Sequence, residues 1–102
     1  MKLTVLERFT LLGVLPAEGN FVTLKIVRKL REALAFTEKE IKDLEMMVEG
    51  ERTKWNPAKD VPRDVEIGEM ATDMIVKALK KLDDTNKLTE QHMSVYEKFI
   101  KG

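Results

Sequence analysis

The chain has 102 residues, of which 43% are hydrophobic and 35% are charged, and this balance excludes an intrinsically disordered protein. Basic and acidic residues number 18 each, so no net charge attracts a nucleic acid or an anionic membrane. The absence of cysteine excludes disulfide bonds and thiolate metal sites. The size predicts a single domain, residues 1–102, with one modest core. No apolar stretch resembles a signal peptide or a membrane span, so a soluble, cytoplasmic protein is expected.

Two helices are predicted in the first third of the chain. Thr4 and Glu7 have the spacing of a capping box, in which each side chain binds the backbone amide of the other residue, so a helix should begin there. Apolar residues cover most of its circumference, which predicts deep burial, and Pro16 should end it. Asn20 is a good N-cap for a second helix, whose apolar residues recur at helical spacing to about Ala35.

A short helix and a β-hairpin are predicted next. Thr37 and Glu40 have the spacing of a second capping box, so a third helix should start almost without a linker. In residues 45–56 the hydrophobic spacing changes to that of strands on either side of Gly50, which indicates a hairpin. Two prolines forbid a regular helix in the polar connection 56–63.

The sequence of the last third of the chain predicts a strand and two helices. Val65 and Ile67 alternate with acidic residues, as in a brief third strand that would join the hairpin in a ribbon. After Gly68, an unbroken apolar stripe over residues 70–82 predicts the clearest helix of the chain, and Thr89 caps a last one. The predicted fold class is α+β and mainly helical, with about five helices around one core and a small antiparallel hairpin; a winged-helix-like arrangement is one version of it.

The residue types that catalysis needs are scarce. The only serine, Ser94, and the only histidine, His92, lie two residues apart on the last predicted helix, where their side chains point in different directions. A zinc site needs three or four ligands, and the scattered glycines form neither a P-loop nor a dinucleotide fingerprint. The chain is therefore expected to be no enzyme and to hold no metal or cofactor.

The predicted hairpin carries the candidate residues for a protein interface. Met46 and Met47 have flexible apolar side chains that suit an adaptable binding surface. Trp55, near the foot of the hairpin, is either a lid over the core or an interface anchor. A domain of this size leaves part of its apolar surface accessible. The leading hypothesis is therefore a non-enzymatic protein-interaction module that self-associates, for example as a homodimer, or binds another protein.

A basic helix face supports an alternative function. Lys25, Arg28 and Lys29 share one outward face of the second predicted helix and could contact phosphates; the other interpretation is an ordinary solvated face. The element order matches a winged helix-turn-helix, in which the third helix enters the major groove of DNA. Residues 37–51, however, contain two basic and six acidic residues, which would repel DNA. The alternative is thus a winged-helix-like nucleic-acid-binding protein that uses the second helix.

Two segments carry a resemblance to a known group of proteins. They are residues 3–31 (LTVLERFTLLGVLPAEGNFVTLKIVRKLR) and residues 67–100 (IGEMATDMIVKALKKLDDTNKLTEQHMSVYEKFI), with the tryptophan-containing hairpin between them. In this pattern the chain resembles small uncharacterised proteins encoded by bacteriophages and prophages. The resemblance covers most of the chain and brings no catalytic or binding residues with it. It implies an accessory viral protein or a protein that interacts with the host.

Overall fold

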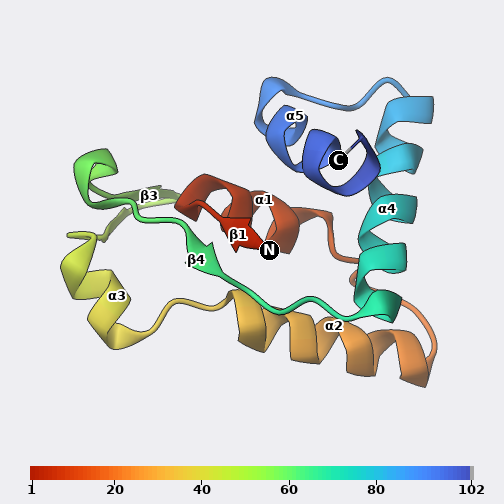
Figure 1. The fold of residues 1–102 in the computed structure, drawn as a ribbon, viewed down its shortest axis with the longest axis horizontal. Coiled ribbons are helices and arrows are strands. Elements are labelled where there is room, and N and C mark those ends of the chain that lie inside the picture. Colours follow the sequence, from red (N-terminus) through yellow and green to blue (C-terminus); the bar gives the residue numbers. More distant parts are fainter. Residues whose placement is uncertain (102) are drawn as a thin grey trace.

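Helices dominate the computed structural model, which describes residues 1–101 (Figure 1). The α-helices of this part are α1 (Val5–Val14), α2 (Phe21–Leu34), α3 (Glu38–Asp43), α4 (Glu69–Asp84) and α5 (Glu90–Tyr96). A π-helical turn, η2 (Glu97–Lys101), continues α5. The strands are β1 (Lys2–Leu3), β2 (Met47–Glu49), β3 (Arg52–Lys54) and β4 (Arg63–Asp64), and a 3-10 turn, η1 (Pro57–Lys59), precedes β4. The predicted α+β, mainly helical class is confirmed.

Local capping signals place the first three helices where the sequence predicts them. The Thr4 hydroxyl accepts a hydrogen bond from the Glu7 amide at 3.2 Å, and the Glu7 carboxylate accepts one from the Thr4 amide at 2.9 Å. Thr37 and Glu40 form the same reciprocal pair at the start of α3. The Asn20 side chain accepts a hydrogen bond from an amide in the first turn of α2. Each cap satisfies backbone amides that have no partner inside the helix.

The strands form two separate antiparallel pairs. β2 and β3 make the predicted hairpin, and Gly50 in its turn has a φ of 62°, which glycine adopts without a steric penalty. β4 pairs with β1 and does not extend the hairpin. The prediction of a third strand at Val65 and Ile67 is therefore wrong in its bounds and its partner: the strand is Arg63–Asp64, and Val65 follows it as a core residue. β1 and β4 have two residues each, which is too short for the alternation of apolar and polar residues that predicts a strand.

The core lies where α1, α2, α4 and α5 meet (Figure 1). In this view α2 runs along the lower edge, α4 stands across one end, and α3 with the β2–β3 hairpin forms the opposite end. The buried apolar cluster consists of Leu3, Leu11, Leu15, Val27, Leu30, Leu34, Val65, Ala71, Ile75, Leu79 and Val95. Because both β1 and α5 contribute to this cluster, an N-terminal strand and a C-terminal helix pack in one core.

α4 ends in a tight turn that leads into α5. The amide of Lys87 donates to the Leu82 carbonyl at 2.8 Å and that of Asn86 to the Asp83 carbonyl at 3.1 Å, which is a Schellman motif. Asn86 has a φ of 57°, a conformation that asparagine adopts more readily than most residues. None of the helices in residues 1–101, α4 included, combines the length and the apolar character that crossing a membrane requires.

α3 is a surface element. It is six residues long, and none of its side chains is buried. The recognition helix of a helix-turn-helix protein lies in the major groove and contacts the base edges of DNA. Here the order helix, helix, short helix, hairpin follows the winged-helix pattern along the chain, but the acidic side chains Glu38 and Asp43 are exposed on α3. This helix is therefore poorly suited to enter a DNA groove.

The cap of α3 supports a stability prediction. Thr37→Ala removes the hydroxyl that accepts the Glu40 amide at 3.1 Å. We expect a loss of about 1 kcal/mol in the free energy of unfolding, equivalent to a melting temperature lower by about 4–8 °C. Thermal melts followed by circular dichroism measure this difference, with Thr37→Ser as the control that retains the hydroxyl. An unchanged melt for Thr37→Ala would contradict the importance of this cap.

Candidate functional site

The predicted interface residues of the hairpin lie in different surroundings. Trp55 is half-buried and packs on Phe9, with ring centroids 5.6 Å apart, and Phe9 packs on Phe36 at 4.9 Å. Met46 is half-buried, whereas Met47 is 61% exposed. Trp55 thus belongs to a cluster of three aromatic rings, and its role as a lid or as an interface anchor stays a prediction.

The hairpin offers no continuous apolar patch. Its most exposed apolar side chains, Met47 and Val48, are consecutive on β2, and consecutive side chains of a strand point to opposite faces. In the strand register Met47 lies opposite Lys54, and Val48 lies opposite Thr53. Each apolar side chain thus has a polar neighbour across the strand, which makes the hairpin a weaker candidate interface than its composition indicates.

The three basic residues predicted to contact phosphates are all exposed on α2. Lys25, Arg28 and Lys29 form no ion pair with any side chain in residues 1–101. Lys29 lines a groove beside α2, and Lys25 lies one helical turn before it. These cations are therefore available to a partner.

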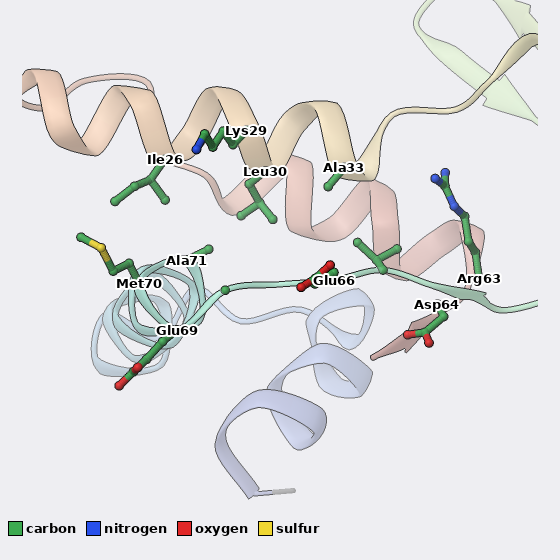
Figure 2. Close-up of a pocket in the computed structure, with 12 residues that line it drawn as sticks. Ile26, Lys29, Leu30, Ala33, Arg63, Asp64, Glu66, Glu69, Met70 and Ala71 are labelled. Carbon is green, nitrogen blue, oxygen red and sulfur yellow. The ribbon is translucent and has the colours of Figure 1, made fainter.

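An apolar groove of about 740 Å³ runs between α2 and the segment 63–71 (Figure 2). Ile26 and Ala33 point from α2 into the groove, and Met70, which is 61% exposed, points from the start of α4 toward Ile26. Val22 lies one helical turn before Ile26 and is 55% exposed, so it extends the apolar side of α2. The buried floor consists of Leu30, Val65 and Ala71.

The two walls of the groove carry opposite charges. Lys29 belongs to the α2 wall, while Glu66 and Glu69 belong to the other wall. Figure 2 shows Glu66 on the segment that faces α2, whereas Glu69 points away from that helix. Arg63 and Asp64, which also line the groove, are engaged: Arg63 pairs with a carboxylate of α3 at 3.0 Å, and Asp64 pairs with the N-terminal amine at 2.9 Å. The side chains of Lys29, Glu66 and Glu69 form no ion pair in the described part of the chain.

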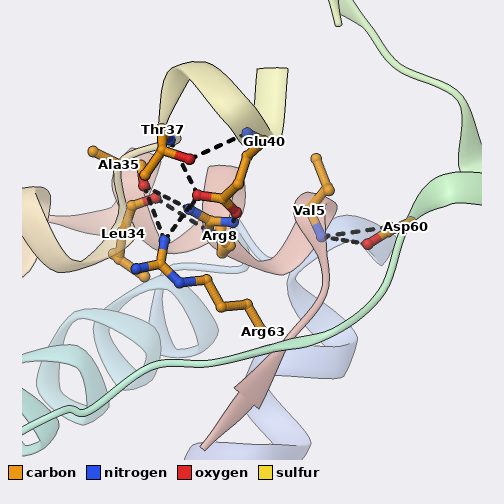
Figure 3. A network of polar contacts seen from close by, with 8 residues as sticks. All are labelled: Val5, Arg8, Leu34, Ala35, Thr37, Glu40, Asp60 and Arg63. Atoms are coloured by element: carbon orange, nitrogen blue, oxygen red, sulfur yellow. Dashed lines mark hydrogen bonds and ion pairs between the residues drawn. The ribbon is translucent and has the colours of Figure 1, made fainter. Parts of the chain in front are cut away.

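A buried arginine of α1, Arg8, binds the C-terminal end of α2 and the N-terminal turn of α3 (Figure 3). Arg8 is 2% exposed and donates to the backbone carbonyls of Leu34 at 3.2 Å and Ala35 at 2.6 Å, where α2 ends. Its guanidinium also forms an ion pair with Glu40 of α3 at 2.6 Å. The face of the guanidinium lies 3.8 Å from the centre of the Phe36 ring, a cation–π contact. Arg8 thus binds the end of one helix and the cap of the next.

Glu40 is held between two arginines. Arg63 approaches the same carboxylate at 3.0 Å and also donates to the Ala35 carbonyl (Figure 3). Burial by itself raises the pKa of Glu40, but the hydrogen bond from Arg8, that from the Thr37 amide and the charges of both arginines lower it to about 2. Glu40 therefore stays ionised at neutral pH, which suits an ion-pair network better than proton transfer.

Glu7 is a second buried charge, at the contact between α1 and α5. It is 4% exposed, and its carboxylate accepts hydrogen bonds from the Lys98 ammonium at 2.7 Å and from the Ser94 hydroxyl, in addition to the Thr4 amide. Burial raises the pKa of Glu7, but the hydrogen bonds from these three partners outweigh it and hold the pKa below the ordinary value of 4.5. Such a carboxylate is a weak base at neutral pH, so this arrangement does not activate the serine as a nucleophile.

His92 and Ser94 have separate partners. The His92 Nδ1 accepts a hydrogen bond from the Thr89 backbone amide at 3.0 Å, at the start of α5. The Ser94 hydroxyl donates to Glu7 on α1. No group of three His, Asp or Glu side chains in residues 1–101 is placed to hold a metal ion.

The sequence did not predict the buried charges or the position of the groove. A signal for Arg8 was present: it follows Val5 by three residues and precedes Leu12 by four, so it interrupts an apolar stripe of α1. Glu7 carried no separate signal of burial, because its place in the capping box accounts for a glutamate at this position. The groove has no local signal, since its walls come from segments that are distant in the sequence.

No family model, no curated protein and no solved structure matches this chain.

Proposed function

We propose that this protein is a non-enzymatic interaction module that self-associates as a homodimer through the groove between α2 and segment 63–71. The observation that carries the proposal is an open apolar groove whose walls have opposite charges. A role as an accessory protein of a phage or prophage is part of the proposal, and it is supported by the pattern of residues 3–31 and 67–100.

A twofold axis makes this groove complementary to itself. In an isologous dimer, a residue on one wall meets a residue on the other wall of the partner, and the same contact recurs in reverse. Lys29 of one protomer then faces Glu66 of its partner, twice per dimer. The exposed side chains of Val22 and Met70 and the half-buried side chain of Ile26 are covered in the same step, which supplies the hydrophobic part of the free energy of association.

Net charge also favours a second copy as the occupant. Basic and acidic residues are equal in number, so two copies approach each other without overall electrostatic repulsion. A strongly charged partner would gain little from this surface, because the two walls of the groove attract opposite charges.

The test is the oligomeric state in solution, measured by size exclusion with light scattering. We expect the wild-type protein to be a dimer at high micromolar concentration and Met70→Glu to be a monomer, because a charge in the apolar groove must be desolvated on association. Met47→Glu is a matched control, since Met47 and Met70 are equally exposed at 61%. A monomeric wild type contradicts the proposal. So does a dimer that Met47→Glu disrupts and Met70→Glu leaves intact.

A charge exchange tests the geometry of the dimer. Lys29→Glu and Glu66→Lys should each weaken association, because each places like charges opposite each other. Combining both substitutions in one chain should restore dimerisation, which a general loss of stability would not do. Failure of the double variant to recover would contradict the proposed pairing.

Nucleic-acid binding remains the alternative, and its supporting observation is that Lys25, Arg28 and Lys29 are exposed without ion pairs in residues 1–101. For the homodimer, binding to duplex DNA at physiological salt should be no tighter than about 10⁻⁴–10⁻⁶ M, the range of nonspecific contact. Submicromolar binding that Lys25→Glu combined with Arg28→Glu abolishes would favour the alternative.

A further inference from the structure

A second cavity of about 610 Å³ lies between the end of α1, α4 and the start of α5. Its walls are mainly apolar: Val14 and Pro16 contribute from the α1 side, and Met74, Ala78 and Leu82 from α4. None of the residues that line the α2–α4 groove lines this cavity. Its volume falls within the range of about 300–1,000 Å³ that is typical of small-molecule sites.

The charged groups around this cavity are all basic. Lys77 and Lys81 lie one turn apart on α4, and Lys87 reaches the cavity from the turn that follows the helix. No acidic side chain lines the cavity, and these lysines form no ion pair within residues 1–101. The carboxylate of Asp83, which is close to them in sequence, accepts the Tyr96 hydroxyl at 3.0 Å. Three cations therefore surround an apolar space without a neutralising partner.

His92 adds a directional hydrogen-bond donor. The residue is half-buried and lines the cavity, and its Nδ1 is occupied as the acceptor of the Thr89 amide at 3.0 Å. In the neutral ring, one nitrogen accepts while the other carries the hydrogen. The hydrogen bond at Nδ1 thus leaves Nε2–H as the ring donor for a ligand.

We propose that this cavity binds a small amphiphilic anion, namely an organic carboxylate with an unbranched apolar chain. The carboxylate would lie among Lys77, Lys81 and Lys87, where charge-assisted hydrogen bonds are stronger than neutral ones. The chain would cover Met74 and Leu82 and remove apolar surface from water. This inference is independent of the proposed dimer, because the two sites share no lining residue.

Decanoate, kept below its micelle concentration, is the probe for the test. Isothermal titration should show saturable binding with one decanoate per chain, and amide resonances of Ala78 and His92 should shift in nitrogen–proton NMR spectra. Lys77→Gln combined with Lys81→Gln should weaken binding by about tenfold or more, through the loss of two charged contacts. Decanol and decyltrimethylammonium, which have the same chain without the negative charge, should bind at least about tenfold more weakly.

Two variants separate the site from general effects. Lys80→Gln removes an exposed lysine of α4 that does not line the cavity, so it should leave decanoate affinity unchanged. Ala78→Phe should fill the cavity and abolish binding. If Ala78→Phe fails to fold, the lysine variants still decide the question, since Lys77, Lys80 and Lys81 are all exposed and tolerate substitution.

Three outcomes would overturn the proposal. They are the absence of saturable decanoate binding, an equal loss of affinity in Lys80→Gln and the double variant, and NMR shifts confined to the groove between α2 and segment 63–71. Sedimentation with phosphatidylglycerol vesicles distinguishes a lipid surface: association with vesicles without binding of free decanoate would assign the lysines to membrane contact and overturn the cavity site.

Discussion

Replacing Arg8 with methionine is expected to lower the free energy of unfolding by about 3–5 kcal/mol, the range for removing one partner of a buried ion pair. Methionine fills part of the volume but donates no hydrogen bond. The carbonyl of Leu34 then loses the side chain that binds it, and the Glu40 carboxylate loses its shortest contact, at 2.6 Å. An unpaired polar group that stays buried retains its full desolvation penalty.

Urea titration at neutral pH measures this effect, together with two further variants. Arg8→Lys retains the charge but loses the planar fork that binds two carbonyls and a carboxylate, so its stability should lie between those of the wild type and Arg8→Met. Arg28→Met, at an exposed position of α2, should change stability by no more than about 0.5 kcal/mol. A loss for Arg8→Met as small as that for Arg28→Met would refute the role of the buried guanidinium.

The second large effect is expected at Glu7. Glu7→Gln retains the shape of the side chain but removes the charge that Lys98 neutralises at 2.7 Å. Because Glu7 is 4% exposed, we expect a loss of about 2–3 kcal/mol at pH 7, the upper range for hydrogen bonds to charged groups. Glu18→Gln, in the exposed turn between α1 and α2, should stay within about 0.5 kcal/mol of the wild type.

The same carboxylate predicts how stability depends on pH. The pKa of Glu7 in the folded protein is below its ordinary value of 4.5. At a pH between the folded and the unfolded pKa, the unfolded chain therefore binds more protons than the folded protein. The contribution of Glu7 to stability is therefore complete above pH 4.5 and is lost as the pH falls through the folded pKa. Glu40, whose pKa is lowered to about 2, contributes a further loss of stability as the pH falls from 4.5 to about 2.

Urea titrations at pH 7, 5, 4 and 3 test this dependence. The stability of the wild type should fall with each step below pH 5, whereas Glu7→Gln should show a shallower fall, because it has one fewer carboxylate with a lowered pKa. Equal slopes for the two proteins would contradict the lowered pKa of Glu7.

Local sequence signals predicted most of the helices, and long-range contacts account for what they missed. The caps at Thr4, Asn20 and Thr37 act within one helical turn, so the residues themselves determine where the helices begin. β1 and β4 pair across 60 residues, and no pattern within either strand indicates the partner. The hairpin was predicted because its turn and both strands are adjacent in the chain.

The candidate site was harder to predict than the fold. Met47 and Trp55 drew attention by residue type, but Trp55 packs on Phe9, which lies far from it in the sequence. The groove depends on how α2 is placed against segment 63–71, and the helical spacing of Met70 suits either a core position or a groove. The burial of Arg8 was not predicted, because its partners, the end of α2 and Glu40, meet it only in the folded protein.

The contacts between Glu7 and the C-terminal helical segment can form only late in the synthesis of the chain. Ser94 and Lys98 follow Glu7 by 87 and 91 residues, so α1 leaves the ribosome long before its counter-charge exists. Until both residues have been synthesised, the Glu7 carboxylate has neither of these partners. Contacts between residues so distant in the sequence also form slowly. The complete set of side-chain contacts to Glu7 can therefore form only after residue 98 has been synthesised, and a chain cut before residue 94 has the Glu7 carboxylate without either side-chain partner.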